Sequence, residues 1–320
     1  MTFAFYSGGE VSLRGQYIMK RRTLFALGLG SLVTAVGGRS LYRRGIISAL
    51  GSAQDLTFQQ DETVLRFATI GDVGTGRRGQ YAVARAMNRH WRRSPFPLTL
   101  MTGDNIYSAG EIEKVNKVFE RPYANLLQNN VKFRAVLGNH DFQTNRGIDQ
   151  IAYSGYNMPA RYYTFSQQPV QFFALDTNLA KIQNQPGEDL WQEQLEWLRK
   201  ELEQSSARWK VVFGHHQVYS SGRYSSDIQL VRELSPIFSE YGVQLYINGH
   251  EHHYERTNPI NGTTYVTSGN GAKLRPVGSS GWTAHASSQL GFTTFSVYSD
   301  RMVISAVDTS NRIYDEGVLL

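Results

Sequence analysis

Short apolar runs alternate with helical patterns between residues 64 and 247 of this sequence. Six runs have the length of buried strands, and they cover residues 64–70, 98–101, 133–137, 170–175, 209–213 and 243–247. Between several of them, apolar residues recur at helical spacing over residues 80–91, 112–127, 190–202 and 228–241. Strands that alternate with helices in this way predict an α/β architecture in which the strands are largely buried.

The pattern changes after residue 262. Residues 263–267, 292–298 and 302–307 are strand-like with no helical pattern between them, which predicts antiparallel strands at the C-terminal end. Residues 38–62 form a polar lead-in before the first buried strand. We therefore expect a single domain over residues 63–320, a length that buries a sizeable core without disulfides or a structural metal.

The first 37 residues have the features of a targeting leader. Lys20, Arg21 and Arg22 form a basic stretch, and residues 23–36 form an uncharged, mostly apolar run that ends among small residues. That run is shorter than the ~20 residues that a membrane-spanning helix needs. The paired arginines fit a twin-arginine signal, with a general secretory signal or a retained anchor as alternatives, and Met19 is an alternative start. We expect a periplasmic or secreted protein, without a stable membrane span once the leader is cleaved.

The amino-acid composition restricts which partners and which metal ligands the chain can have. The chain has 33 Lys and Arg against 27 Asp and Glu, a formal net charge of +6, and the leader carries half of this excess. The arginines between residues 77 and 93 are interleaved with apolar residues at helical spacing, which predicts a solvated helix face and no nucleic-acid partner. The absence of Cys excludes disulfides and thiolate nucleophiles, so any metal must have nitrogen and oxygen ligands.

Five of the strand-like runs lead to a glycine followed by a polar side chain. The segments are Gly71-Asp72, Gly103-Asp104, Gly138-Asn139-His140-Asp141, Gly214-His215-His216 and Gly249-His250-Glu251-His252. Ligands bind at the carboxyl ends of strands in α/β sheets, and glycine permits the tight turn that aims the next side chain over the sheet edge. Each pair alone is typical of a turn, but five in this order predict one site.

Carboxylates, a carboxamide and imidazoles form a mixed set of ligands that suits zinc, iron or manganese better than calcium. Six or seven ligands are too many for one ion that must also bind substrate, but they suit two ions about 3.5–4 Å apart with a bridging carboxylate. Residues 74–79 also match the G-x-G-x-x-G dinucleotide pattern. The next strand, however, leads to Asp104 of the metal pattern, which disfavours that alternative.

At these residues the chain resembles the purple acid phosphatases within the calcineurin-like metallophosphoesterases. The superfamily pattern D-x-G, G-D-x, G-N-H-[ED], G-H and G-H-x-H is matched between Asp72 and His252. The narrower mark is G-D-x-x-Y, matched by residues 103–107, and residues 252–257 also resemble that family. The resemblance implies a four-layer αββα sandwich of two mixed β-sheets flanked by helices.

The resemblance also implies roles for individual residues. Seven of them would hold two ions: Fe(III) on Asp72, Tyr107 and His252, a divalent Fe, Zn or Mn ion on Asn139, His215 and His250, and Asp104 as the bridge. A tyrosine phenolate is a hard anionic donor, which suits Fe(III). His140 would contact the phosphate or protonate the leaving group.

One family position differs. The family usually carries a further substrate-contacting histidine about nine positions after the one matching His215, and this chain has Tyr224 there. His216 is too close in sequence to replace it. The expected substrate contacts are therefore His140, Asn139, Arg223 and Tyr224, and the identity of the leaving-group acid stays open.

The predicted reaction is hydrolysis of a small phosphate monoester by a metal-bound hydroxide. No protein nucleophile is needed, and the sequence contains no G-x-S-x-G. One alternative is a di-manganese or di-zinc phosphodiesterase or nucleotidase of the same superfamily, which applies if Tyr107 is not a ligand. The other is an inactive protein of this fold that binds metal or phosphate.

Overall fold

The computed structural model describes residues 62–182 and 189–320. The predicted leader over residues 1–37 and nearly all of the lead-in over residues 38–62 lie outside this part of the chain, so both stay predictions. Within the described residues, no helix is long and apolar enough to cross a bilayer.

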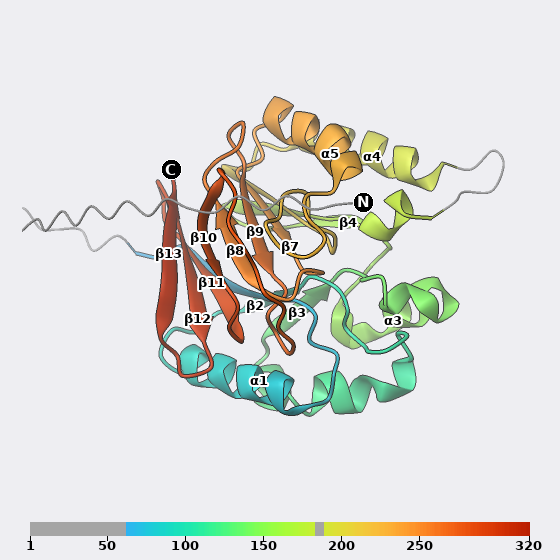
Figure 1. Cartoon of the computed structure of the whole chain (residues 1–320), viewed down its shortest axis with the longest axis vertical. Coiled ribbons are helices and arrows are strands. Elements are labelled where there is room, and N and C mark those ends of the chain that lie inside the picture. Colours follow the sequence, from blue (N-terminus) through green and yellow to red (C-terminus); the bar gives the residue numbers. More distant parts are fainter. Residues whose placement is uncertain (1–61, 183–188) are drawn as a thin grey trace, which may run out of the picture. The chain divides into compact units, whose positions relative to one another are not determined.

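Six strands form the first sheet. They are β1 (Leu65–Ile70), β2 (Leu98–Met101), β3 (Lys132–Ala135), β11 (Gly291–Val297), β12 (Met302–Asp308) and β13 (Ile313–Leu319). Their order is β13-β12-β11-β1-β2-β3 (Figure 1). β1, β2 and β3 run parallel, and β11 joins β1 to an antiparallel ribbon with β12 and β13. The sheet is therefore mixed.

Seven strands form the second sheet. They are β4 (Tyr163–Gln167), β5 (Val170–Ala174), β6 (Trp209–Phe213), β7 (Leu245–Asn248), β8 (Tyr254–Thr257), β9 (Thr264–Ser268) and β10 (Thr283–Ser287). Their order is β10-β8-β9-β7-β6-β5-β4. β5, β6, β7 and β9 are parallel, whereas β4, β8 and β10 pair antiparallel with their neighbours. This sheet is also mixed.

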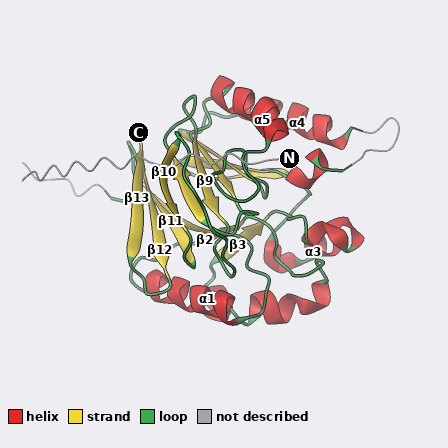
Figure 2. Cartoon of the chain, viewed as in Figure 1, coloured by secondary structure: helices red, strands yellow, loops and turns green. Residues whose placement is uncertain are grey.

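Helices lie on the outer sides of the two sheets (Figure 2). They are α1 (Arg78–Trp91), α2 (Ala124–Gln128), α3 (Ile148–Ala152), α4 (Leu190–Gln204) and α5 (Ile228–Glu240). Short 3-10 turns cover Asp141–Gln143, Asn145–Gly147, Ser154–Tyr156 and Thr177–Ala180. The layered arrangement of two mixed sheets with flanking helices confirms the predicted fold class.

The two faces of the second sheet have different neighbours, because successive strand residues point to opposite sides. Phe172 of β5 and Val211 of β6 belong to the core that includes the first sheet, where Phe172 meets Phe67 edge-on at 5.1 Å between ring centroids. Phe173 and Val212 instead pack in the core beneath α4 and α5. Both faces are thus buried, which explains why these strands are continuous apolar runs.

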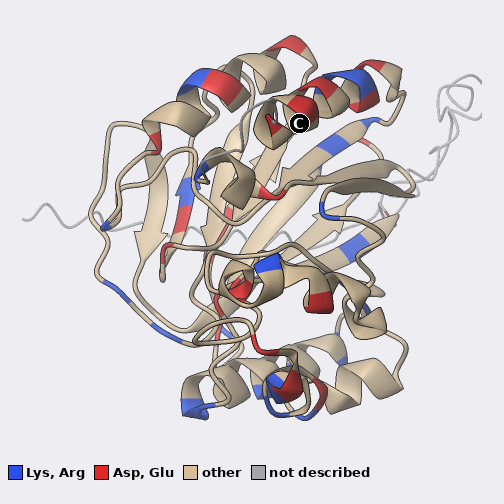
Figure 3. Ribbon diagram, turned by 90° about the vertical axis from the view of Figure 1, so that its right-hand side faces the viewer, with Lys and Arg blue, Asp and Glu red and all other residues tan. Residues whose placement is uncertain are grey.

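Charges lie on the outer helices. Figure 3 shows acidic and basic segments interspersed along the helices at the top and bottom of that view. On α1, Val83 and Met87 are buried while Arg85, Arg89 and Arg92 are exposed, so the arginine cluster is a solvated face as predicted.

Two predictions about elements are wrong. Residues 112–127 do not form one helix but a 3-10 turn (Ile112–Lys114), a π-helical turn (Asn116–Glu120) and α2. The carbonyl oxygens of Lys117 and Val118 accept hydrogen bonds from Tyr81 and Gln80 of α1, which compete with regular helix bonding. The run at 263–267 is also not wholly antiparallel, because β9 lies parallel to β7 on one side.

Candidate metal centre

The predicted donor side chains follow the carboxyl ends of five parallel strands, three in the first sheet and two in the second. Asp72 follows β1, Asp104 follows β2 and Asn139 follows β3, whereas His215 follows β6 and His250 follows β7. The two sheets bring these loops together, since side chains from both sheets are within hydrogen-bonding distance of one another. The contacts divide into two groups of three donors.

Asp72, Tyr107 and His252 form the first group. The Tyr107 hydroxyl lies 3.2 Å from Asp72 Oδ1 and 3.3 Å from His252 Nε2. His252 Nε2 lies 3.3 Å from the same Asp72 oxygen, which closes a triangle of three donor atoms. All three residues are buried.

Asn139, His215 and His250 form the second group. Asn139 Oδ1 lies 3.1 Å from His215 Nε2 and 3.0 Å from His250 Nδ1. The two histidine nitrogens are 3.1 Å apart. These atoms come from three loops in two sheets, so their convergence is a tertiary feature.

Asp104 adjoins both groups. Its Oδ1 lies 3.5 Å from His215 Nε2 of the second group. On the other side, ligand atoms of Asp104, Asp72 and His252 all lie within 4.8 Å of one another and could hold a metal ion. Asp104 therefore has the position that a bridging carboxylate needs.

The hydrogen bonds of His215 favour a cation at the second group. His215 Nδ1 lies 2.8 Å from the carbonyl oxygen of Thr102, which can only accept, so Nδ1 carries the proton. In the neutral ring, Nε2 then presents a lone pair to Asn139 Oδ1, which is also an acceptor. Burial lowers the pKa of His215, but Asp104 and Asp72 outweigh it and raise that pKa. The position thus attracts positive charge, and the donor set fits a metal ion.

Burial affects two further donors in opposite senses. Burial and the charge of His215 lower the pKa of His250 to about 3, so its ring is neutral and suited to ligation. Burial, followed by the carboxylates of Asp72 and Asp104, raises the pKa of Tyr107. A cation beside Tyr107 would reverse this balance, because it stabilises the phenolate.

The backbone at this site is strained at the ligands themselves. Asp72, Asp104 and His250 have φ values of 57°, 52° and 66°, in the left-handed region that non-glycine residues rarely adopt. Of the five preceding glycines, Gly103 has positive φ (87°). At Gly138 the reason is close packing, because an added Cβ would lie 2.2 Å from the Asp104 backbone nitrogen. The expected tight-turn role of glycine thus applies to only part of the set.

Asp141 has a supporting role that the sequence did not reveal. It is fully buried, and its carboxylate accepts four N–H bonds, from the backbones of Asn105, Ile106 and Gly138 and from the Gln150 side chain. It thereby fixes the loop that carries Asp104 to the loop that carries Asn139. Burial and Asp104 raise the pKa of Asp141 to about 6.

His140 lies at the open side of the centre. Its Nδ1 bonds to the Ser108 carbonyl oxygen, and its Nε2 lies 4.0 Å from Asp104 Oδ2. The side chain is 34% exposed, so solvent and substrate can reach it. His216, in contrast, is buried and held by Thr177 Oγ1 at 2.7 Å, away from a substrate-contacting role.

Tyr224 and Arg223 lie on an exposed loop above the second group. The Tyr224 ring stacks on His250 with ring centroids 4.8 Å apart and an interplanar angle of 24°. Its backbone N–H donates to Glu251, which anchors the loop to the ligand segment. The Arg223 guanidinium lies 5.9 Å from the Tyr224 ring centroid.

Lys273 and Arg275 are neighbours of the centre that sequence reasoning missed. Lys273 Nζ lies 3.2 Å from the centroid of the Tyr107 ring, and Arg275 Nη1 donates to the His250 carbonyl oxygen at 3.2 Å. A signal was present, because the strand β9 ends at Ser268 and leads directly into Gly269-Asn270-Gly271, a sixth strand followed by glycine and a polar residue.

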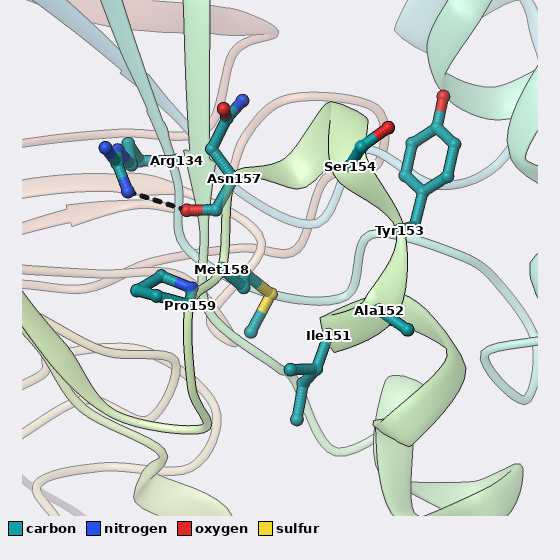
Figure 4. A pocket seen from close by; sticks show the side chains of 8 residues that line it. All are labelled: Arg134, Ile151, Ala152, Tyr153, Ser154, Asn157, Met158 and Pro159. Atoms are coloured by element: carbon teal, nitrogen blue, oxygen red, sulfur yellow. Dashed lines mark hydrogen bonds between the residues drawn. The ribbon is translucent and has the colours of Figure 1, made fainter.

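A cavity of about 290 Å³ opens between β3 and the segment that follows α3 (Figure 4). Arg134 and Asn157 line it together with residues 151–154 and 158–159, none of which is a predicted site residue. Arg134 donates to the Asn157 carbonyl oxygen at 2.8 Å, as the dashed line shows, and stacks over Phe165 at 4.7 Å. None of the proposed metal ligands or substrate contacts lines this cavity.

Comparison with known proteins agrees with this geometry. The family model for calcineurin-like phosphoesterase matches residues 65–254, which contain all of the predicted metal ligands. The chain belongs to the calcineurin-like phosphoesterase family. This phosphoesterase is 29% identical over 242 residues to mouse (Mus musculus) tartrate-resistant acid phosphatase type 5, covering 66% of this chain and 74% of the relative. It is 30% identical over 239 residues to purple acid phosphatase 3 of Arabidopsis thaliana, covering 65% and 63% of the two chains.

Solved structures support the same fold. The phosphoesterase resembles GAP50, described as the anchor in the inner membrane complex of Plasmodium, with a TM-score of 0.70 and 21% identity over 80% of this chain and 88% of that one. It also resembles purple acid phosphatase PPD1 from yellow lupin, Lupinus luteus, with a TM-score of 0.66 and 18% identity over 79% and 53% of the chains. Family membership and the acid phosphatase relatives make this protein a metal-dependent phosphoesterase.

Proposed function

We propose that this phosphoesterase hydrolyses phosphate monoesters at a dinuclear centre of Fe(III) and a divalent Fe, Zn or Mn ion. The observation that carries the proposal is the pair of three-donor groups that share Asp104. Two sets of three donors with one shared carboxylate suit two ions, because each ion keeps room for substrate.

The proposed ligands follow the two groups. Asp72, Tyr107 and His252 would hold Fe(III), because a phenolate and a carboxylate are hard anionic donors. Asn139, His215 and His250, a neutral set, would hold the divalent ion, and Asp104 would be shared between the two sets. When bound, the ions supply Lewis-acid charge for the phosphate and an activated water molecule.

His140 is the proposed proton donor. Its Nδ1 faces the Ser108 carbonyl oxygen, which fixes a proton there and leaves Nε2 directed toward the centre. Partial exposure lets Nε2 take a proton from solvent and pass it to the leaving oxygen. Asn139 can contact the phosphate through its Nδ2 while Oδ1 faces the histidines, and Tyr224 and Arg223 border the leaving-group side.

The decisive experiment combines metal analysis, a visible spectrum and a matched substrate pair. We expect two metal ions per chain, an absorption band in the middle of the visible range, and faster hydrolysis of p-nitrophenyl phosphate than of bis(p-nitrophenyl) phosphate. Faster diester hydrolysis without the band would favour the di-manganese or di-zinc phosphodiesterase. Failure of the metal-loaded protein to hydrolyse either ester would favour a binding protein.

We also propose that the protein is exported to the periplasm or secreted. The basis is the leader pattern over residues 1–37, with Arg21 and Arg22 ahead of an apolar run. N-terminal sequencing of protein from fractionated cells tests this. A mature protein that begins near residue 38 is expected, and an uncleaved leader in the cytoplasmic fraction would contradict export.

A further inference from the structure

Two basic side chains lie on one short segment beside the metal centre. Lys273 and Arg275 are two residues apart, and Leu274 between them is 43% exposed. Lys273 lies over the Tyr107 ring, next to the first donor group, and Arg275 lies 4.9 Å from the Tyr224 ring centroid, next to the second. We call Lys273 and Arg275 the cationic pair.

The segment is held against the ligand loop. The Arg275 backbone N–H donates to the His252 carbonyl oxygen at 2.9 Å, and its Nη1 donates to the His250 carbonyl oxygen at 3.2 Å. Arg275 is thus positioned by the same loop that supplies two proposed metal ligands. Such anchoring reduces the entropy that a long basic side chain loses when it binds a substrate anion.

The cationic pair lacks carboxylate partners. Among the described residues, no Asp or Glu oxygen lies within 4.0 Å of either basic group. The site therefore concentrates positive charge that nothing in the described chain pairs directly.

Charge balance indicates what the pair is for. A trivalent and a divalent ion would be offset by the carboxylates of Asp72 and Asp104, the phenolate of Tyr107, the hydroxide of the proposed reaction and the two charges of a phosphate monoester, with one negative charge in excess. Lys273 and Arg275 together exceed that single charge, so one of their two positive charges would remain without a counter-anion. Arginine is suited to bind a carboxylate or phosphate through two parallel hydrogen bonds.

We propose that Lys273 and Arg275 form a subsite for a second anionic group, a carboxylate or phosphate carried by the leaving group of the substrate. The proposal rests on the proposed monoester hydrolysis and adds a substrate class to it. Tyr224 contacts both the His250 ring and the Arg275 guanidinium, at 4.8 and 4.9 Å from its ring centroid, and thus borders this subsite. The enzyme should thus select acidic phosphate esters over neutral ones.

Two matched ligand pairs test the proposal. For binding, calorimetry on the metal-loaded protein compares 3-phosphonopropionate with propylphosphonate, which differ by a carboxylate in place of a methyl group and cannot be hydrolysed. For turnover, kcat/KM is compared between 3-phosphoglycerate and glycerol 3-phosphate. We expect the wild type to favour the acidic member at least tenfold in both, the contribution of one good charge-assisted contact.

The variants are Lys273→Gln and Arg275→Gln, with Leu274→Gln as the matched control on the same segment. Lys273→Gln and Arg275→Gln should each lower the ratio of affinity, and of kcat/KM, for the acidic over the neutral ligand severalfold. The double variant should bring this ratio near one, and Leu274→Gln should leave it at the wild-type value. Lys273→Gln removes no hydrogen bond of the described chain, so it should fold. Arg275→Lys keeps the charge if Arg275→Gln does not fold.

The outcomes separate this proposal from the proposed function. A wild type that hydrolyses none of these monoesters, nor p-nitrophenyl phosphate, would overturn the proposed function. A wild type that hydrolyses them with a ratio that Lys273→Gln and Arg275→Gln leave unchanged would overturn the subsite alone. If Lys273→Gln and Arg275→Gln weaken the binding and turnover of acidic and neutral ligands equally, the subsite would also be overturned, because the cationic pair would then contact only the reacting phosphate.

Discussion

Replacing Asp141 tests whether one buried carboxylate holds the metal-binding loops together. Oδ2 accepts from the Asn105 and Gly138 backbones at 3.0 and 2.8 Å, and Oδ1 accepts from the Ile106 backbone and Gln150 Nε2, both at 2.9 Å. In Asp141→Asn, one oxygen becomes an NH₂ group that faces two donors. The least costly orientation puts it toward Gln150, whose amide oxygen can turn to accept, at the expense of the bond that Gln150 Nε2 donates to the Gly110 carbonyl oxygen at 3.1 Å.

The magnitude follows from the bonds lost. Asp141→Asn then leaves the Ile106 N–H unsatisfied in the interior and weakens the remaining bonds, which lose the charge of their acceptor. An unsatisfied buried donor costs about 1–3 kcal/mol, and loss of the acceptor's charge adds to this. Relief from burying a carboxylate offsets part of the loss. We expect the free energy of unfolding to fall by about 2 kcal/mol for Asp141→Asn and about 4 kcal/mol for Asp141→Ala.

Urea denaturation of the metal-loaded protein measures the effect, and Asp149→Asn is the matched control. Asp149 is a partly exposed carboxylate near the same loop whose side-chain contact is with exposed Asn145. The control should shift the midpoint little, whereas Asp141→Asn should lower both the midpoint and the bound metal content. A wild-type midpoint and metal content in Asp141→Asn would refute the argument that this carboxylate joins the two loops.

Three further predictions concern single side chains. His215→Ala should remove the divalent ion and most activity while circular dichroism stays unchanged, and full turnover would contradict its assignment. Tyr107→Phe should abolish the visible band, and a persistent band would mean that another residue binds iron. Asp315→Asn should lower the free energy of unfolding by about 2 kcal/mol, because Asp315 accepts two bonds from Arg256 at 2.7 and 2.9 Å and joins β13 to β8 across the two sheets. Burial raises the pKa of Asp315, but its bonds with Arg256 outweigh burial and lower that pKa overall. The stabilisation by this ion pair is therefore present above pH ~3.9 and is lost as the pH falls further. The difference in urea midpoint between the wild type and Asp315→Asn should shrink at pH ~3.

The strands most accessible to prediction were those buried on both faces. β2, β5 and β6 read as apolar runs because helices or a second sheet cover each side. β10 was missed because its sequence, Thr283–Ser287, is small and polar and lies at the edge of the second sheet. β8 was missed because Glu255 and Arg256 interrupt its apolar pattern, and their burial depends on partners in distant segments.

The candidate site shows the same division. Six of the seven proposed ligands are Asp, Asn or His side chains at strand ends, which metal chemistry favours, and Tyr107 was proposed from the family resemblance. The supporting residues could not be predicted, because their roles depend on contacts between loops. Asp141 is recognisable only when four N–H groups are seen around it, and Lys273 only when its ammonium group lies over the Tyr107 ring.

The strain in the backbone and the support beneath it belong together. Asp72, Asp104 and His250 hold left-handed φ values that each cost free energy, and such conformations persist only where the surroundings enforce them. Here the Asp72 carboxylate accepts from the His250 N–H at 2.8 Å, and the Asp104 carboxylate accepts from the His140 N–H at 3.0 Å. Ligand carboxylates that also fix the neighbouring loops set the donor positions before any ion binds. The cationic pair follows the same logic, since the segment that carries it is tied to the His250 and His252 carbonyl oxygens, so metal binding and leaving-group selection depend on one connected set of loops.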